Sequence, residues 1–269
     1  MVCCSVCILA SSIKKINTVA AAPYRILKNL QMSSMTPSSS TAMPFLQYMN
    51  NHMDVILASA SPRRKELLSL MGLQNFRVLK SDFAEDLDQS KYPNASSYCL
   101  DTAVAKAADV VYNIEKTDGH QRKGMILIGS DTIVEIDGKI LEKPKDVEDA
   151  YKMISLLSGQ FHTVHTAVVV FGNGPAATTV GDGSFSVGQL VKLTSFVEST
   201  SVKFIDLAEA DKAAYIESRE GFDKAGGYGI QGLGGQMVEK IDGCYFNVMG
   251  LPISKLSKAL AVLHDLQKI

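Results

Sequence analysis

Short apolar runs and amphipathic segments alternate along the chain from residue 54 onward. Apolar runs bounded by turn-forming residues predict strands, and apolar positions that recur every three or four residues predict helices. The predicted strands cover residues 55–58, 76–79, 125–128, 163–171, 196–207 and 237–241. The predicted helices cover residues 62–71, 96–111, 147–157, 209–218 and 253–266. This alternation predicts one α/β domain with a mixed sheet and flanking helices.

One antiparallel pair within that sheet is predicted by a turn signal. The dipeptide Asp137-Gly138 separates two apolar segments, 133–136 and 139–141. Asp-Gly favours a two-residue hairpin turn because both turn positions require positive φ. Residues 172–189, in contrast, are rich in Gly, Ser, Thr and Ala without periodicity, and they predict a mobile surface loop.

The first 53 residues differ in composition from the rest. They contain four Lys or Arg residues, no Asp or Glu, and many Ser and Ala. These traits are typical of an organellar transit peptide. An untargeted disordered extension, or translation that begins at Met32, Met35 or Met53, is the alternative. We therefore predict a disordered or targeting extension over residues 1–53 and a folded domain over residues 54–269.

The overall charge balance argues against several classes of partner. The chain has 27 basic and 28 acidic residues among its 269, so it lacks the positive field that non-specific nucleic-acid binding requires. No apolar run approaches the roughly 20 residues that span a bilayer, so no membrane partner is expected.

Cys99 and Cys244 are isolated in the sequence, and we interpret them as small apolar fillers in a reducing compartment. A cytoplasmic location is expected, with organellar targeting by residues 1–53 as the alternative.

Two hydroxyls and three cations meet where the first strand leads into a helix. This first cluster runs from Ser59 to Lys65, with Ser61 as the predicted N-cap and Arg63 and Arg64 in the first turn. Free backbone N–H groups at a helix N-terminus favour an anion, and the fork of arginine suits phosphate. A capped helix with a solvated basic turn is the structural alternative.

A second cluster places a carboxylate beside an apolar strand. Asp131 lies in the segment 129–132, which follows the strand 125–128 and precedes further apolar residues. A carboxylate among apolar strand residues is costly unless it is paired or metal-bound. A turn-forming Asp that bonds the nearby backbone is the alternative. Lys143 lies just beyond the hairpin and could bring a positive charge to the same place.

A third cluster, over residues 223–235, is rich in glycine. Gly227, Gly229 and Gly232 formally satisfy a dinucleotide-binding pattern. We reject that reading because a strand-like segment follows and no strand precedes. A flexible or tightly turning loop is the alternative to a ligand-binding loop. His162 and His165 lie three apart in a predicted strand, so they point to opposite faces, and we interpret them as structural.

The three clusters together resemble the Maf family of nucleotide pyrophosphatases. The resemblance covers residues 54–264 and rests on segments that occur in the order and approximate spacing of the family: 56–64, 66–68, 129–132, 142–144, 157–159, 223–232 and 248–252. It implies a mixed α/β fold with a deep cleft, related to the inosine-triphosphate pyrophosphatases, and often a homodimer. It also implies a divalent metal, Mg²⁺ or Mn²⁺, and cleavage between the α- and β-phosphates of a nucleotide.

The resemblance also implies roles for particular residues. Asp131 would accept a proton, while Arg63, Thr132 and Gln231 would be the specificity positions of the subgroup that acts on dTTP and UTP. Ser130 stands where the family commonly has Ala. The physical chemistry agrees, since a triphosphate needs cations and hydroxyl or backbone donors. The candidates for these contacts are Ser59, Ser61, Arg63, Arg64, Lys106 and Lys143.

A metal and an activated water would need carboxylates, for which Asp131 and Glu85 are the candidates. Asp82 and Asp86 neighbour Glu85, and a solvated acidic turn is the alternative there. Two other functions remain open: a nucleotide-binding regulator of cell division without significant catalysis, and a pyrophosphatase for modified nucleotides.

Overall fold

The computed structural model describes residues 43–117, 124–173, 190–266 and 269 of the chain. The strands are β1 (Asp54–Ala58), β2 (Phe76–Val78), β3 (Met125–Ile136), β4 (Lys139–Leu141), β5 (Phe161–Asn173), β6 (Leu190–Phe204) and β7 (Val238–Asp242). The helices are α1 (Pro44–His52), α2 (Pro62–Met71), α3 (Ala95–Thr117), α4 (Val147–Leu157), α5 (Glu209–Glu217), α6 (Tyr245–Met249) and α7 (Ile253–Asp265). Short 3₁₀ turns cover Gln89–Lys91, Ala225–Gly227 and Gly232–Met237.

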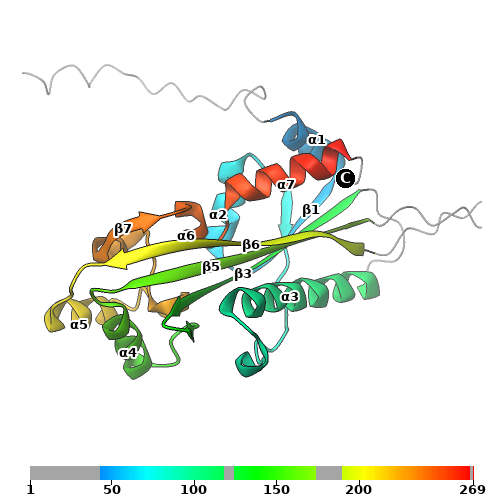
Figure 1. Ribbon diagram of the computed structural model, residues 1–269. Helices are drawn as coiled ribbons and strands as arrows, with labels where there is room; N and C mark the ends of the chain where they lie inside the picture. Colours follow the sequence, from blue (N-terminus) through cyan, green and yellow to red (C-terminus); the bar gives the residue numbers. More distant parts are fainter. Residues whose placement is uncertain (1–42, 118–123, 174–189, 267–268) are drawn as a thin grey trace, which may run out of the picture. The chain divides into compact units, whose positions relative to one another are not determined.

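The strands form one seven-stranded mixed sheet in the order β2-β1-β3-β5-β6-β7, with β4 paired to β3 (Figure 1). β1 is parallel to both β2 and β3, and the remaining pairs are antiparallel. Helix α3 covers one face of this sheet, and α1, α2 and α7 cover the other (Figure 1). The predicted α/β class with a mixed sheet and flanking helices is therefore confirmed.

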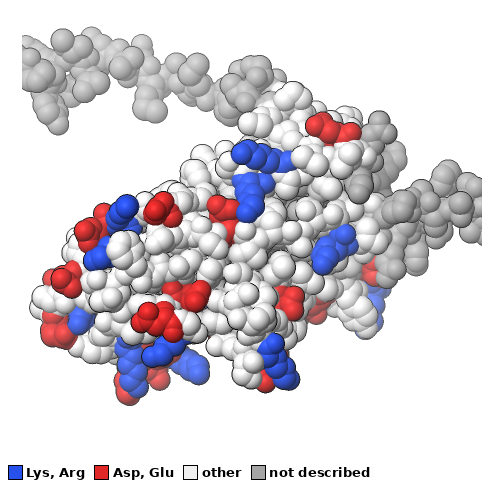
Figure 2. All heavy atoms as spheres, in the orientation of Figure 1, with Lys and Arg blue, Asp and Glu red and all other residues white. Residues whose placement is uncertain are grey.

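Charged side chains of both signs are distributed over the surface that Figure 2 presents. Basic and acidic groups lie next to one another there, so this face carries mixed charge and no extended field of one sign. Among the residues that the structure describes, no helix is long and apolar enough to cross a membrane.

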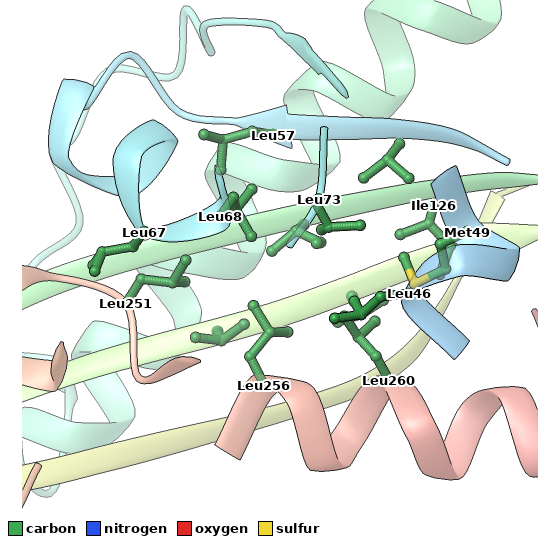
Figure 3. Close-up of a cluster of buried hydrophobic side chains, with 14 of the residues drawn as sticks. Leu46, Met49, Leu57, Leu67, Leu68, Leu73, Ile126, Leu251, Leu256 and Leu260 are labelled. Carbon is green, nitrogen blue, oxygen red and sulfur yellow. The ribbon is translucent and has the colours of Figure 1, made fainter. Parts of the chain in front are cut away.

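The hydrophobic core has a layer on each face of the sheet. On one face, leucines from α2 and α7 pack with Ile126 of β3, as Figure 3 shows for Leu67, Leu68, Leu256 and Leu260. On the other face, the small side chains of α3 let the helix approach the sheet closely. A Cβ at Gly129 would lie only 2.6 Å from the Cβ of Ala107, so this contact requires a glycine in β3.

The predicted hairpin is confirmed. Asp137 and Gly138 have φ of 49° and 72°, and they connect β3 to β4 with Ile136 opposite Lys139. Positive φ at both central positions is the property of the primed turn that Asp-Gly favours. Gly172 and Asn173, expected in the loop, belong to β5, and residues 174–189 lie outside the described residues.

The predicted boundary between extension and domain at residue 53 is wrong. Residues 44–52 form helix α1, and its Phe45, Leu46 and Met49 are buried in the core on the α7 side of the sheet. Their spacing is amphipathic, and Pro44 suits the first helical position. The prediction was wrong because residues 44–52 contain no Asp or Glu, like the Ser-rich residues before them, and composition alone does not separate the two. Residues 1–42, on which the targeting hypothesis rests, lie outside the described residues.

Replacement of Leu46 by Ala tests whether α1 is part of the folded domain. Leu46 is 2% exposed, so we expect a loss of about 2–5 kcal/mol in the free energy of unfolding, as for other buried leucines. Urea denaturation measures this loss. Asn51→Ala, on the exposed side of the same helix, is the control. Equal unfolding midpoints for both variants would mean that α1 is not packed in solution.

The two strand histidines lie on opposite faces, as predicted. His162 Nε2 is 2.8 Å from the hydroxyl of Tyr228, and His165 Nε2 is 2.9 Å from Glu135 Oε2. His162 also packs edge-on against Phe204. Burial lowers the pKa of His162 from 6.5 to about 4.

This lowered pKa predicts acid sensitivity of the fold. Between pH 6.5 and 4 the unfolded chain binds a proton at His162 that the folded state does not bind. The free energy of unfolding should therefore fall as the pH falls, by about 3 kcal/mol from this group near pH 4. In His162→Gln the difference in stability between pH 7 and pH 4 should shrink by that amount, measured by urea denaturation. His52→Gln, at an exposed position, should retain the wild-type difference, and an unchanged difference in His162→Gln would contradict the assignment.

Candidate active site

A cavity of about 360 Å³ opens beside the middle of β3. β1 ends at Ala58, opposite Gly129, and β4 ends at Leu141, opposite Val134. Between these points, residues 130–133 of β3 pair with β5 on one side, and the cavity occupies the other side. The interruption in the sheet thus creates a cleft that side chains from both faces can reach.

Every site residue predicted from the sequence lines this one cavity. They are Ser59, Ser61, Arg63, Arg64, Glu85, Lys106, Asp131, Thr132, Lys143 and Gln231. The condition on which the functional prediction depended, that Asp131 shares a pocket with Arg63 and Gln231, is therefore met.

Asp131 lies within a continuous strand, not in the turn that the sequence left open as an alternative. Its side chain points toward α3, where Oδ1 accepts a hydrogen bond from Lys106 Nζ at 2.7 Å. The side chain of Asp131 is 9% exposed and that of Lys106 is 14% exposed. A charge pair this well shielded from water is stronger than one at the surface. Within the described ranges of the chain, Lys106 is the cation that pairs with this buried carboxylate.

Lys106 also bonds a second carboxylate. Its Nζ lies 2.8 Å from Glu85 Oε2, and Lys143 Nζ lies 3.8 Å from the other oxygen of Glu85. Partial burial raises the pKa of Glu85, but the hydrogen bond and charge of Lys106 outweigh it, so the net pKa is lowered. The ammonium of Lys106 therefore sits between the carboxylates of Asp131 and Glu85 and bonds both.

These two carboxylates were the candidates for a divalent metal. Among the described residues there is no cluster of three or more His, Cys, Asp or Glu side chains that could hold a metal alone. Mg²⁺ is commonly bound by one or two carboxylates together with waters and substrate phosphates. Asp131 and Glu85 already converge on one cation, the Lys106 ammonium. Their oxygens therefore fit a metal that is completed by a phosphate ligand.

The first turn of α2 is built as the capping signals predicted. Ser61 Oγ accepts a hydrogen bond from the backbone N–H of Arg64 at 3.4 Å, and Gly72 ends the helix with φ of 108°. The hydroxyl proton of Ser61 is not used by this cap, so it can donate to a ligand. Arg63 has no hydrogen-bond or ion-pair partner within the described part of the chain, although it lines the cavity. Both groups are available to an anion.

Arg64, in contrast, is engaged by the protein itself. Its Nε donates to the backbone oxygen of Gly250 at 2.9 Å, Nη1 to Ser59 Oγ at 3.1 Å and Nη2 to Thr132 Oγ1 at 2.9 Å. Burial lowers the pKa of this guanidinium. Arg64 thereby joins the β1–α2 turn to β3 and to the loop between α6 and α7. Two of its five N–H groups remain for a phosphate.

Thr132 lies on the opposite face of β3 from Asp131. Its hydroxyl contacts Thr166 Oγ1 at 3.0 Å, and Thr166 donates to the backbone oxygen of Asn247 at 2.9 Å. The order of donors means that Thr132 accepts from Arg64 and donates to Thr166. Thr166 and Asn247 were not predicted, because no local pattern connects residues so distant in the chain.

The glycine-rich cluster is tightly folded. Gly226, Gly227 and Gly232 have φ of 68°, 72° and 80°, values that favour glycine. The N–H of Gly226 donates to the backbone oxygen of Glu142 at 3.0 Å, and β7 follows the cluster. The segment is therefore tightly turned, and it carries Gln231 into the cavity wall.

Tyr98 and Glu142 are further residues at the site to which no role was assigned from the sequence, although Glu142 belongs to the segment 142–144 of the family resemblance. The Tyr98 hydroxyl donates to Glu142 Oε1 at 2.6 Å, and Glu142 lines the cavity next to Lys143. Burial, together with this hydrogen bond, raises the pKa of Tyr98. The pair fixes the strand end that carries Lys143. The place of Glu142 beside Lys143 in that segment is the signal that indicates a role at the site.

Residues 54–263 match the family described as Maf-like protein. A probable bifunctional dTTP/UTP pyrophosphatase/methyltransferase protein from Homo sapiens is 42% identical over 213 residues, which are 79% of this chain and 32% of the human protein. The chain thus matches about a third of that relative's length. A dTTP/UTP pyrophosphatase from Thermoanaerobacter sp. (strain X514) is 42% identical over 80% of this chain and 99% of its own length. A dTTP/UTP pyrophosphatase from Clostridium perfringens (strain SM101 / Type A) is 42% identical over 77% of this chain and 96% of its own length. Among solved structures, a HAM1 protein from Coxiella burnetii aligns over 78% of this chain and 99% of its own, with 11% identity and a TM-score of 0.35.

Proposed function

This chain belongs to the Maf family, and we propose that it hydrolyses dTTP and UTP to the nucleoside monophosphate and pyrophosphate. The observation that carries the proposal is the buried carboxylate of Asp131, which shares one cavity with Arg63 and Gln231. The relatives from Thermoanaerobacter and Clostridium, named dTTP/UTP pyrophosphatases and matched over nearly their full length, support the same activity.

The triphosphate is held by the groups that the cavity leaves available. Arg63 and the hydroxyl of Ser61 offer donors at the N-terminus of α2, and Lys143, which also lines the cavity, offers a positive charge. Charge-assisted bonds of this kind suit phosphate oxygens. Arg64 contributes mainly by holding the β1–α2 turn against β3 through its bonds to Ser59 and Thr132.

Gln231 reads the base. Its side-chain amide carries both a donor and an acceptor, which match the O4 carbonyl and the N3–H group of uracil or thymine. Cytosine presents the reverse pattern, an amino donor and an unprotonated N3 acceptor, so both contacts would be lost while the amide of Gln231 is held in the orientation that suits uracil. The same argument makes dTTP and UTP equivalent, because they share this edge.

Asp131 accepts the proton of the attacking water. The water oxygen forms a bond to the α-phosphorus, the bond from that phosphorus to the bridging oxygen breaks, and pyrophosphate leaves. Lys106 orients the carboxylate through its 2.7 Å hydrogen bond. A bound Mg²⁺ or Mn²⁺ ion would be held by Asp131 and Glu85 and would stabilise negative charge on the phosphate.

The test is an assay of the full-length chain on UTP, dTTP, CTP and triphosphates with methylated bases, with and without Mg²⁺. We expect UMP and pyrophosphate from UTP, the corresponding products from dTTP, and no turnover without metal. Binding of UTP without hydrolysis would favour the nucleotide-binding regulator. Faster hydrolysis of a methylated nucleotide would favour the pyrophosphatase for modified nucleotides. UDP and phosphate as products would contradict the mechanism.

A homodimer and a cytoplasmic location are also part of the proposal, because the family resemblance implies the first and the composition the second. Light scattering on the purified chain and imaging of the tagged full-length protein test them.

A further inference from the structure

The carboxylate of Glu220 holds the loop that carries Gln231. Glu220 Oε2 accepts a hydrogen bond from the N–H of Leu233 at 2.8 Å, and Oε1 accepts one from the N–H of Gly234 at 3.0 Å. We propose that Glu220 is a positioning residue that fixes Gln231 and, through it, determines which base is accepted. This inference rests on the proposed function, because it assigns the base contact to Gln231.

The two bonds define the orientation of the backbone. Each oxygen of one carboxylate accepts from one of two consecutive N–H groups, just after Gln231. Such a pair fixes both the position and the tilt of the peptide planes, and bonds to a charged acceptor are the stronger kind. A side-chain amide in place of the carboxylate could accept at one atom only, and its NH₂ group would face the second N–H.

The loop on both sides of Gln231 is held at short range. A Cβ at Gly232 would lie 2.6 Å from Glu220 Oε2, so only glycine lets the carboxylate approach this closely. On the other side, the N–H of Gly229 donates to the hydroxyl of Tyr215 at 3.3 Å. Gln231 therefore lies between two anchored points, and Glu220 provides the charged one.

Glu220 is itself fixed in place and does not line the cavity. The ammonium of Lys224 bonds the backbone oxygen of Glu220 and also bonds Asp223 Oδ1 at 2.6 Å. The carboxylate of Glu220 thus acts on the ligand only through the loop. An effect of Glu220 on base choice would have to be transmitted by Gln231.

The experiment compares binding of the non-hydrolysable α,β-methylene analogues of UTP and CTP by calorimetry. We define the ratio as the dissociation constant for the CTP analogue divided by that for the UTP analogue. For Glu220→Gln we expect this ratio to fall about tenfold, the size of one lost charge-assisted bond. Glu217→Gln, an exposed glutamate at the end of α5, is the matched control and should leave the ratio unchanged. Glu220→Asp keeps both acceptor oxygens on a shorter side chain and should give an intermediate ratio.

Two further measurements decide whether the effect passes through the loop. In Glu220→Gln the amides of Leu233 and Gly234 should exchange hydrogen at least about tenfold faster. In a Gln231→Ala background, Glu220→Gln should cause no further change in the ratio. An unchanged ratio in Glu220→Gln, or additive effects of the two substitutions, would overturn the inference while leaving the proposed function in place. Failure of the wild-type chain to prefer the UTP analogue would overturn the base assignment on which both depend.

Discussion

Replacement of Asp131 by Asn is expected to lower kcat for UTP by about 10²- to 10⁴-fold, while the affinity for the nucleotide changes little. The amide has nearly the shape of the carboxylate, so the cavity keeps its form. It cannot take up a proton from water at neutral pH, however, and it loses the charge that pairs with Lys106 at 2.7 Å. Hydrolysis of UTP should therefore be lost, while binding of UTP is kept.

The measurement for Asp131→Asn is pyrophosphate release, combined with calorimetric binding of UTP. Asp137→Asn is a matched control in the same polypeptide stretch, because Asn also fits the positive φ of 49° at this exposed hairpin position. The control should keep wild-type kcat. Wild-type pyrophosphate release by Asp131→Asn would remove this residue from the reaction.

Replacement of Lys106 by Met is expected to lower kcat/KM for UTP by about 10²- to 10³-fold. Met has a similar length but no charge, so Asp131 and Glu85 would face each other without the ammonium that lies 2.7 and 2.8 Å from them. The pKa of Glu85 should rise when this partner is lost, since Lys106 is the main group that lowers it against the effect of burial. Asp131 would then be a poorly ordered base.

Steady-state kinetics on UTP measures the effect of Lys106→Met. Lys116→Met changes the exposed last turn of the same helix and serves as the control. Circular dichroism shows whether both variants keep the wild-type fold. A Lys106→Met protein with kcat/KM close to that of the control would show that the bridge between the two carboxylates is dispensable.

Local features of the fold could be predicted because their causes are local. Ser61 and Gly72 delimit α2, and the Asp137-Gly138 turn forms the hairpin, through preferences that act within a few residues. Helix α1 was not predicted although its apolar spacing is regular, because it shares the acid-free composition of the residues before it. A boundary drawn from periodicity alone would have included it.

The site could be predicted only as a set of candidate residues. The segment 129–132 looked like an interruption in a strand because polar side chains break the apolar run, yet β3 continues through it. Its polar groups are satisfied by partners that come from elsewhere in the chain: Lys106 for Asp131, and Arg64 for Thr132. Arg64 reaches Gly250, which is 186 residues away in sequence, and no local pattern encodes such a contact. The family resemblance indicated which segments contain site residues, and the fold shows that these segments meet at one cavity.

The unpaired stretch of β3 has a practical consequence for ligand design. Because side chains and peptide groups alternate in direction along a strand, alternate main-chain N–H and C=O groups of residues 130–133 face the cavity where β1 and β4 are missing. An inhibitor that bonds these groups would contact atoms that every amino acid except proline supplies. Exchange of a lining side chain could not delete those contacts, so resistance would have to arise by distorting the strand itself.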